Sequence, residues 1–547
     1  MQTVREVIER MLPDGTGGRK DRWSLVPIWP PDLFAVSATL VNLSGCYAHT
    51  RYLCGFGDCA FDADYRKDIE RIGESYASGE TEGALKKAWK TLASRDWLVQ
   101  ADDSKNAEWW DAAMRLMAIA DAACAGIGFA SEAPTPVTVF AFEAYLSRLN
   151  GESALLPFLP HSLCASVSPE IACVQPKTRT PQIGCTLRAL SHNLALLPPL
   201  GDVKTHWRYA VTRSDDSSEP LNVLLLPFPF QIRGSAFASV VNPDEARDSP
   251  RPAFFELNQE WLEGIKAAEF AAVIHELISV GLAEVPRVHA VILPEGALQE
   301  DMARDVALQL RKEANIELFI SGVASKDGDK PKNRTYSAIF NDRELVAEWT
   351  QSKHHRWKLD EQQIRRYHLG HVLGQRSAWW ESIDVANREC HFYVFRHGAS
   401  LAVLVCEDLA RIDPVQNVVR AVGPNLVIAL LMDGPQLERR WPGRYATVLA
   451  DDPGSAVLTL TSVGLIRRSN MPSERGPRQI ALWKEPLGTA RELELPEGCH
   501  ALLLTLSPDK EENITADGRS DDKMTTKLSL TSVIGIRMPK PPNWLRV

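Results

Sequence analysis

Over the first 150 residues, apolar side chains recur at every third or fourth position, which is the repeat of an amphipathic helix. This pattern predicts a mainly helical region over residues 1–150, and such a region is suited to assembly or to binding a partner. The helices expected from the spacing are 5–12, 32–47, 65–76, 84–97, 108–127 and 140–149.

Prolines interrupt the pattern over residues 151–220, which we interpret as a connecting segment. One helical run, 186–197, is predicted within it. The polar stretch SDDSSEP at 214–220 is typical of a linker. We therefore expect a domain boundary near residue 220.

Beyond this boundary, short apolar runs alternate with amphipathic stretches, which indicates a layered α/β domain over residues 221–506. A hairpin is predicted over 335–349, turning at Asn341-Asp342. A polar loop at 507–525 and a C-terminal arm make up the remainder, 507–547. The other expected strands are 221–227, 288–293, 316–323, 390–396, 401–406, 425–432, 456–463, 479–483 and 500–506, and the expected helices are 256–281, 299–314 and 414–422.

Composition narrows the class of protein. Hydrophobic residues make up 45% and charged residues 24%, as in ordinary globular domains. The net charge of −9 argues against a broad basic surface, so nucleic acid is not an expected partner. No apolar run approaches the roughly 20 residues that span a bilayer, and the acids in MQTVREVIERML are unlike a secretory signal. We expect no membrane association and a cytoplasmic location.

The 10 cysteines are irregularly spaced and predict reduced thiols rather than a disulfide framework. His49, Cys54 and Cys59 are close in sequence but lack the paired Cys-x-x-Cys spacing of zinc sites. We therefore expect core or surface thiols there and no bound metal.

One cysteine stands out. The apolar run 401–405 ends abruptly at Cys406, which is followed by Glu407 and Asp408. A strand of this kind is predicted to be buried on both faces. Side chains at the carboxyl ends of such strands project into a crevice, where α/β enzymes commonly place a nucleophile. A buried core cysteine is the alternative interpretation of this segment alone.

Two other segments supply charged residues at strand ends. Glu295 follows Pro294 at the end of one predicted strand, and Lys353 follows the predicted hairpin. Glu361 comes eight residues after Lys353. Since strand ends distant in sequence converge on one edge of a layered domain, Glu295, Lys353 and Cys406 are expected to share a pocket.

The chemistry of such a group is coherent. A thiol needs a base to remove its proton, and a carboxylate shielded from water, such as Glu295, has a pKa raised toward the working range. The cation of Lys353 would favour a thiolate and stabilise an oxyanion. Glu361 would orient Lys353 or the leaving amine, and a backbone N–H just past Cys406 would be a second oxyanion donor. Together these residues predict acyl transfer through a thioester, with water as the acceptor.

The three motifs, in this order, resemble those of the nitrilase (carbon–nitrogen hydrolase) superfamily over about residues 221–506. Pro294-Glu295 matches the family's Pro-Glu pair, Lys353-His354-His355 matches its lysine motif, and GASLAVLVCED at 398–408 matches its nucleophile motif. The Cys-Glu-Asp form is similar to that of the glutaminase domains of glutamine-dependent NAD synthetases. The resemblance implies a four-layer α-β-β-α sandwich that hydrolyses an amide and assembles as a dimer or larger oligomer, with Glu361 as the family's second Glu.

The chain departs from this pattern in two places. The lysine motif lacks the Leu after its His, and Lys358 competes for the same role. Glu407 replaces the aromatic residue that usually follows the cysteine. Glu407, Trp441 and Arg444 are candidates to bind the substrate; Arg444 would suit a carboxylate-bearing substrate, and a surface salt bridge is its alternative role.

We therefore expect a nitrilase-superfamily hydrolase that cleaves a non-peptide carbon–nitrogen bond of a small-molecule amide, without a cofactor and as a homo-oligomer. The alternative is a catalytically silent scaffold whose helical region binds a protein partner, for example in a bacterial defence system. Charged groups buried around a thiol favour the enzyme, because a scaffold has no need of them.

Overall fold

The computed structural model describes most of the chain. The expected helix at 140–149, and also Cys54 and Cys59, lie outside the described residues. The described residues are 2–12, 24–49, 63–94, 96–100, 107–125, 162–181, 184–199, 203–209, 219–240, 253–328, 330–341, 344–374, 378–396, 399–473, 476–521 and 523–545.

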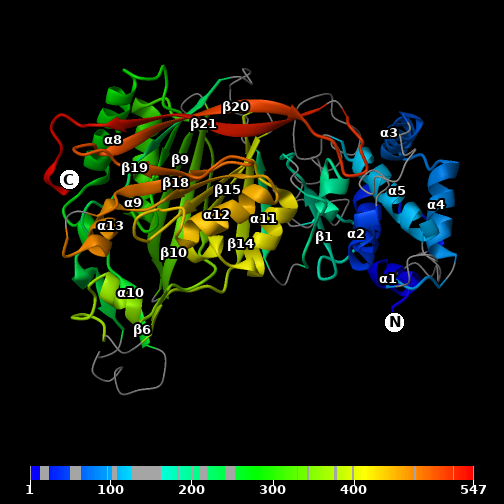
Figure 1. Cartoon of the computed structure of the whole chain (residues 1–547), viewed down its shortest axis with the longest axis horizontal. Coiled ribbons are helices and arrows are strands. Elements are labelled where there is room, and N and C mark those ends of the chain that lie inside the picture. The colour runs from blue at the N-terminus through cyan, green and yellow to red at the C-terminus, as the bar shows by residue number, and fades with distance from the viewer. Residues whose placement is uncertain are drawn as a thin grey trace.

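Within the described part of residues 1–150, five helices form, close to where the apolar spacing predicts them. Helix α5 packs against α2, α3 and α4. The α2 helix is buried over most of its length, which fits its apolar sequence. In Figure 1 this region lies at one end of the molecule, in blue. The helices are α1 (Val4–Met11), α2 (Pro30–Ser44), α3 (Ala63–Ala77), α4 (Gly83–Ala93) and α5 (Ala107–Ala123).

The connecting segment forms three strands, β1 (Cys173–Pro176), β2 (Leu194–Leu197) and β3 (Lys204–Tyr209). The helix predicted over 186–197 is therefore wrong. Only one short turn forms, at Leu187–Leu190, before the chain becomes extended. The buried carboxylate of Asp121 accepts hydrogen bonds from three successive backbone N–H groups, at 2.6–2.9 Å, which a continuing helix would have used itself. Those three amides belong to His192, Asn193 and Leu194.

Two large sheets form the centre of the remaining described part of the chain. The eight-stranded sheet has the order β11-β10-β9-β7-β4-β20-β21 with β8 beside β9, and the seven-stranded sheet has the order β19-β18-β17-β16-β15-β14-β3. The predicted hairpin is confirmed as the antiparallel pair β10–β11. The strands are β4 (Leu221–Leu225), β7 (Ala290–Ile292), β8 (Leu298–Gln299), β9 (Leu318–Asp327), β10 (Lys330–Asn341), β11 (Glu344–Ser352), β14 (Glu389–Phe395), β15 (Ala399–Val405), β16 (Leu426–Leu430), β17 (Ala456–Leu460), β18 (Gln479–Lys484), β19 (Arg491–Glu494), β20 (Ala501–Glu512) and β21 (Met524–Ile536).

The two sheets stack face to face between two layers of helices, so the predicted α-β-β-α sandwich is confirmed. Helix α9 (Glu300–Glu313) lies against β9, β10 and β11, and it packs on α8 (Ala267–Gly281). On the other side α12 (Trp441–Asp451) packs on β17 and β18. Between the sheets, the ring of Trp349 on β11 meets that of Tyr393 on β14 with centroids 4.8 Å apart. One continuous apolar core includes residues from both sheets.

A small third sheet, of order β12-β13-β6-β5, lies at one end of the sandwich. Strand β6 occupies the start of the predicted helix 256–281, which in fact begins only at α8 after a glycine turn at Gly264 (φ 77°). The strands are β5 (Phe237–Ser239), β6 (Ala253–Leu257), β12 (Lys358–Leu359) and β13 (Trp379–Glu381), and the remaining helices are α10 (Glu361–Arg366), α11 (Asn417–Val422) and α13 (Val463–Asn470).

The sheets extend beyond the expected domain limits of 221 and 506. Strand β3 comes from the connecting segment. Both ends of the polar stretch expected as a loop at 507–525 lengthen the β20–β21 hairpin instead, because β20 continues to Glu512 and β21 begins at Met524. Backbone pairing does not require apolar side chains, so the polar ends of these two strands lack the alternation of apolar residues that predicts a strand from sequence. Figure 1 shows the hairpin running from the sandwich toward the helical region, where Ala516 N–H donates to Ala189 O at 2.7 Å.

No helix within the described ranges has the length and apolar character that crossing a bilayer requires.

Asp121 should anchor the connecting segment to α5. Replacing it with Ala removes the acceptor of three buried amides, each hydrogen bond to a charged group being worth about 1.5–3 kcal/mol. We expect native-state hydrogen exchange over 191–197 to become at least about 10- to 100-fold faster, since losing the equivalent of only one of the three bonds, about 1.4–2.8 kcal/mol, produces that change. Asp111→Ala, at an exposed position of the same helix, is the control and should leave this exchange unchanged. Equal exchange in both variants would contradict this role.

Candidate active site

Cys406 stands directly after β15, whose seven residues are all buried. Its side chain is only 2% exposed. Its backbone has φ 46°, a left-handed conformation that costs an L-residue about 1–2 kcal/mol. A sharp turn of this kind directs the side chain away from the line of the strand, as in strand-to-helix nucleophile elbows.

Glu295 is held by a tight turn after β7. The next residue, Gly296, has φ 63°, a conformation that glycine adopts without strain. On the neighbouring strand, Gly322 N–H donates to Pro294 O at 3.1 Å. A Cβ atom on Gly322 would lie 2.4 Å from the Glu295 Cα, so only glycine fits at 322. The position of the Glu295 backbone is thus fixed by β9.

Lys353 follows β11 and is fully buried. Its Nζ lies 2.8 Å from Glu295 Oε1 and 2.7 Å from Glu381 Oε2. The side-chain amide of Asn333 donates to both carboxylates, at 2.7 and 2.8 Å. One ammonium and one amide therefore join two buried carboxylates, and this is the arrangement that compensates the cost of burying them.

Glu361 does not take part in this network, so the expectation that it orients Lys353 is wrong. It begins α10, is half exposed, and pairs with Arg365 on the same helix. Glu381, at the end of β13, contacts Lys353 instead. Neither Glu381 nor Asn333 belongs to a motif that the sequence shows.

The loop of Lys353 is tied to the turn of Cys406 through Asp408. The buried Asp408 carboxylate accepts from the backbone N–H of His354 at 3.1 Å, and it lies 3.1 Å from His355 Nδ1. Lys358, the competing lysine, is exposed, with its Nζ 5.6 Å from the Trp380 ring centroid. The geometry therefore favours Lys353 as the lysine of the site.

Burial sets the protonation of the site. It raises the pKa of the Cys406 thiol well above its ordinary value; Glu295 raises it further, and Lys353 only partly offsets this. Burial also raises the pKa of Glu295, against the opposing effect of Lys353. For Lys353 burial acts to lower the pKa, but the two carboxylates and Cys406 outweigh it and hold the pKa well above the ordinary value. Burial thus favours the neutral thiol form of Cys406, and Lys353 acts in the direction of the thiolate, as the sequence predicts.

Two polar groups remain available at the centre of the site. Among the described residues, Glu295 Oε2 is buried and has no hydrogen-bond partner, because Lys353 and Asn333 both bind Oε1. The ammonium of Lys353 has three N–H donors, and the described contacts to Glu295 and Glu381 use two of them. One acceptor and one donor are therefore open.

Met432 links the cysteine to the glutamate turn. Its backbone acts to lower the pKa of the Cys406 thiol, against the larger effect of burial. Its methyl carbon lies 3.1 Å from the position that a Cβ on Gly296 would occupy. Met432 is therefore close both to Cys406 and to the turn that holds Glu295.

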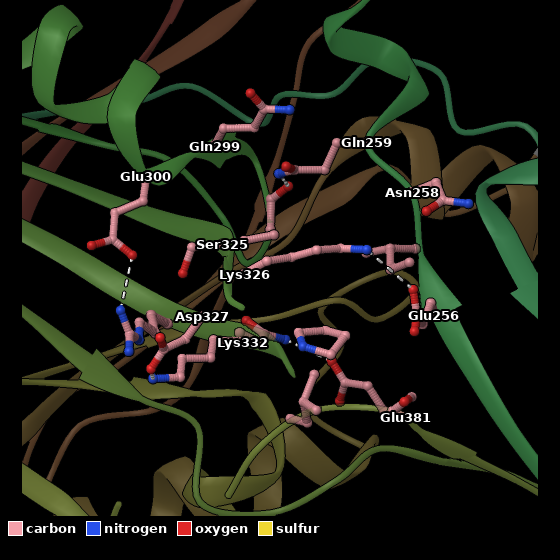
Figure 2. A pocket seen from close by; sticks show the side chains of 18 of the residues that line it. Glu256, Asn258, Gln259, Gln299, Glu300, Ser325, Lys326, Asp327, Lys332 and Glu381 are labelled. Carbon is pink, nitrogen blue, oxygen red and sulfur yellow. Dashed lines mark hydrogen bonds and ion pairs between the residues drawn. The ribbon is translucent and has the colours of Figure 1, made fainter. Parts of the chain in front are cut away.

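A cavity of about 620 Å³ reaches the network at Asn333 and Glu381 but does not reach Cys406. Figure 2 shows the charged side chains around it, with Glu381 at one edge. Most of these charges are paired: Lys326 with Glu256, Lys332 with Asp327, and Arg334 with Glu300, at 3.7, 2.7 and 3.0 Å.

The three candidate substrate-binding residues do not line this cavity. Glu407 pairs with Arg411 at 2.7 Å. Trp441 packs against the core beneath α12, and Arg444 is exposed on that helix. Arg440, in contrast, is mostly buried and lies 2.7 Å from Asp433.

No protein-family model and no curated protein matches the chain. Similar solved structures include Nit3 of Saccharomyces cerevisiae, a member of branch 10 of the nitrilase superfamily, at 13% identity over 51% of this chain and 90% of that one (TM-score 0.30). A glutamine-dependent NAD+ synthetase from Acinetobacter baumannii is 13% identical over 57% of this chain and 48% of that one (TM-score 0.31). A carbon–nitrogen hydrolase from Helicobacter pylori is 9% identical over 58% and 89% (TM-score 0.28). These similarities concern the fold alone.

Lys353→Met should destabilise the protein strongly, because it leaves two carboxylates buried without their cation. Breaking a buried pair in this way costs about 3–5 kcal/mol, which thermal unfolding would detect as a lower midpoint. Lys358→Met, on the same loop but exposed, should have little effect. Adding Glu295→Gln and Glu381→Gln to Lys353→Met should recover part of the loss. Similar midpoints for the two single variants would contradict the assigned network.

Proposed function

We propose that this protein is a carbon–nitrogen hydrolase that cleaves an amide through a thioester on Cys406. The observation that carries the proposal is the open Oε2 of Glu295. Leaving a buried carboxylate oxygen without a donor costs about 1–3 kcal/mol or more, and the cost is understandable if that oxygen receives a proton in the reaction. The neighbouring proton that a carboxylate could take is that of the Cys406 thiol.

In the first half of the reaction, the sulfur of Cys406 attacks the amide carbonyl carbon while its proton passes to Glu295. The carbonyl oxygen becomes an oxyanion, which the open N–H of Lys353 stabilises. Glu295 then gives the proton to the amide nitrogen, the carbon–nitrogen bond breaks, and the amine leaves. Cys406 is left as a thioester.

In the second half, water attacks the thioester carbon and Glu295 takes a proton from it. The second tetrahedral intermediate collapses, the carbon–sulfur bond breaks, and the sulfur regains a proton from Glu295. The products are a carboxylic acid and an amine, and the residues return to their starting state. Glu381 and Asn333 act as positioning residues, because they hold Lys353 and Glu295 rather than the reacting atoms.

The polar lining of the cavity beside Glu381 favours a polar substrate. Its charges are largely paired with one another, so an uncharged polar amide would meet hydrogen-bonding groups without displacing an ion pair. Since Cys406 does not line the cavity, substrate entry requires side chains around Asn333 and Glu381 to move. The second candidate, a catalytically silent scaffold whose helical region binds a partner, is favoured by this closed position of the thiol.

Turnover would distinguish the two functions. We expect ammonia release from one or more members of a panel of small primary amides that includes L-glutamine, and a covalent adduct on Cys406 detected by mass spectrometry of the intact protein. Cys406→Ala should abolish both, and Glu295→Gln should lower the rate about 10²- to 10⁴-fold, as loss of a general base does. Cys390→Ala, at another buried cysteine, is the matched control. Ammonia release that survives in Cys406→Ala would refute the mechanism, and no turnover with any amide would favour the scaffold.

The two glutamates near Lys353 in sequence give a second test. With an amide that is turned over, Glu381→Gln should lower kcat at least about tenfold with little change in KM, because Lys353 loses a charged partner that positions it. Glu361→Gln should stay within about twofold of the unchanged protein, since it lies in solvent. The reverse ranking would mean that Glu361 reaches Lys353 in the working enzyme.

A further inference from the structure

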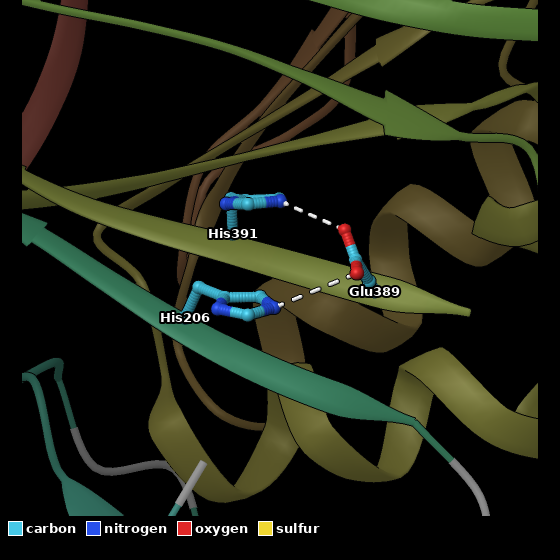
Figure 3. A group of neighbouring side chains, drawn as sticks. All are labelled: His206, Glu389 and His391. Carbon is cyan, nitrogen blue, oxygen red and sulfur yellow. Dashed lines mark ion pairs between the residues drawn. The ribbon is translucent and has the colours of Figure 1, made fainter. Parts of the chain in front are cut away.

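A second group of polar side chains lies between the two sheets, near the edge where β3 joins β14. His206 of β3 is directly opposite His391 of β14 in the parallel register. Their imidazole rings are stacked, with centroids 4.7 Å apart and an angle of 16° between the planes. Figure 3 shows the two rings one above the other, with an edge of each facing Glu389.

Glu389 completes the group because it precedes His391 by two residues on the same strand and therefore shares its face. One carboxylate oxygen lies 3.6 Å from His391 Nε2, and the other lies 3.9 Å from His206 Nε2. One potential ligand atom from each of the three residues fits within 4.8 Å of the others. Two ligands bound tetrahedrally at 2.0–2.2 Å from a zinc ion are about 3.4 Å apart, so the observed separations are close to those of one shared ion.

We propose that His206, Glu389 and His391 bind a divalent transition-metal ion, with Zn²⁺ as the best match. Two imidazoles and one carboxylate form a His₂Glu donor set, which leaves a fourth tetrahedral position for water. Imidazole ligands favour zinc, copper or nickel over calcium or magnesium, which prefer oxygen. A metal ion lies in the plane of each imidazole ring that binds it, so the two rings, now nearly parallel, would have to tilt toward one another as the ion binds.

The surroundings suit a metal site with a structural role. Trp349 of the opposite sheet stacks on His391, with centroids 6.0 Å apart, which limits the movement of that ring. The side-chain amide oxygen of Gln351 accepts from the His391 backbone N–H at 2.9 Å. Groups that fix the orientation of a ligand are a regular feature of protein metal sites.

An ion bound by these three residues would hold β3 of the connecting segment against β14 of the seven-stranded sheet. In the described part of the chain, β3 is an edge strand that pairs with β14 alone. The backbone oxygen of Glu389 accepts from His354 Nε2 at 2.9 Å, and His354 is adjacent to Lys353. The ion would therefore stabilise β14, whose Glu389 holds the loop after Lys353 through His354. It would not contact the reacting atoms. It takes no part in the proposed hydrolysis, so either inference can fail without the other.

Titration with Co²⁺ tests the site on the full chain. After dialysis against a chelator, we expect the protein to bind one equivalent of Co²⁺ with the weak visible bands of nitrogen and oxygen ligands, and Zn²⁺ to displace it. His206→Gln, Glu389→Gln and His391→Gln should each weaken binding by more than about tenfold, since even groups that only orient a ligand are worth about 10- to 100-fold. His275→Gln on α8 is the control and should bind as the unchanged protein does.

Three results would overturn the proposal: no stoichiometric binding, equal affinity in the three site variants and the control, or an intense thiolate-to-cobalt band that places the ion on cysteines. Thermal unfolding distinguishes a variant that has lost the ion from one that has misfolded. Zn²⁺ should raise the midpoint of the unchanged protein and of His275→Gln but not that of Glu389→Gln, whose shape is nearly that of the original residue. Circular dichroism should show the same helix content in all of them.

Discussion

The buried ammonium of Lys353 between Glu295 and Glu381 is the interaction on which the candidate site depends. Each of these groups is nearly inaccessible to water, so each alone would carry a large desolvation cost. They come from the ends of three different strands, β7, β11 and β13. The ion pairs therefore fix how these strand ends meet, and a change at any one of the three charges alters the environment of the others.

The relative positions of Glu295, Lys353 and Cys406 also depend on how the two large sheets stack. Glu295 and Lys353 follow strands of the eight-stranded sheet, whereas Cys406 follows a strand of the seven-stranded sheet. Asp408 crosses this interface by binding the loop after Lys353, and the Met432 side chain, beyond β16, lies beside the glutamate turn. The apolar core between the sheets thus sets the geometry of the site, because a shift of one sheet would separate Cys406 from Glu295 and Lys353.

The sequence predicted those parts of the site that have a local signal. Glu295, Lys353 and Cys406 each end a predicted strand, and the structure brings their segments together. The sequence could not show which of Glu361 and Glu381 contacts Lys353. Glu381 reaches it because β13 pairs with β6, whereas Glu361 lies on α10 and faces solvent. Asn333 had a weak signal, as a polar residue that alternates with others on the buried face of β10. His206 and His391 are 185 residues apart, and only the parallel pairing of β3 with β14 joins them.

Charge balance limits what the site can bind at its centre. With the thiol neutral, two carboxylates face one ammonium, so the buried network carries an excess of one negative charge. That excess favours the uptake of one proton, as the proposed transfer from the thiol to Glu295 would require, and it disfavours a second anion in the same buried space. A neutral amide carbonyl adds no charge until the sulfur attacks it, and the proton taken by Glu295 then offsets the new oxyanion. The arrangement is therefore suited to the proposed reaction, in which proton transfer and attack would occur together.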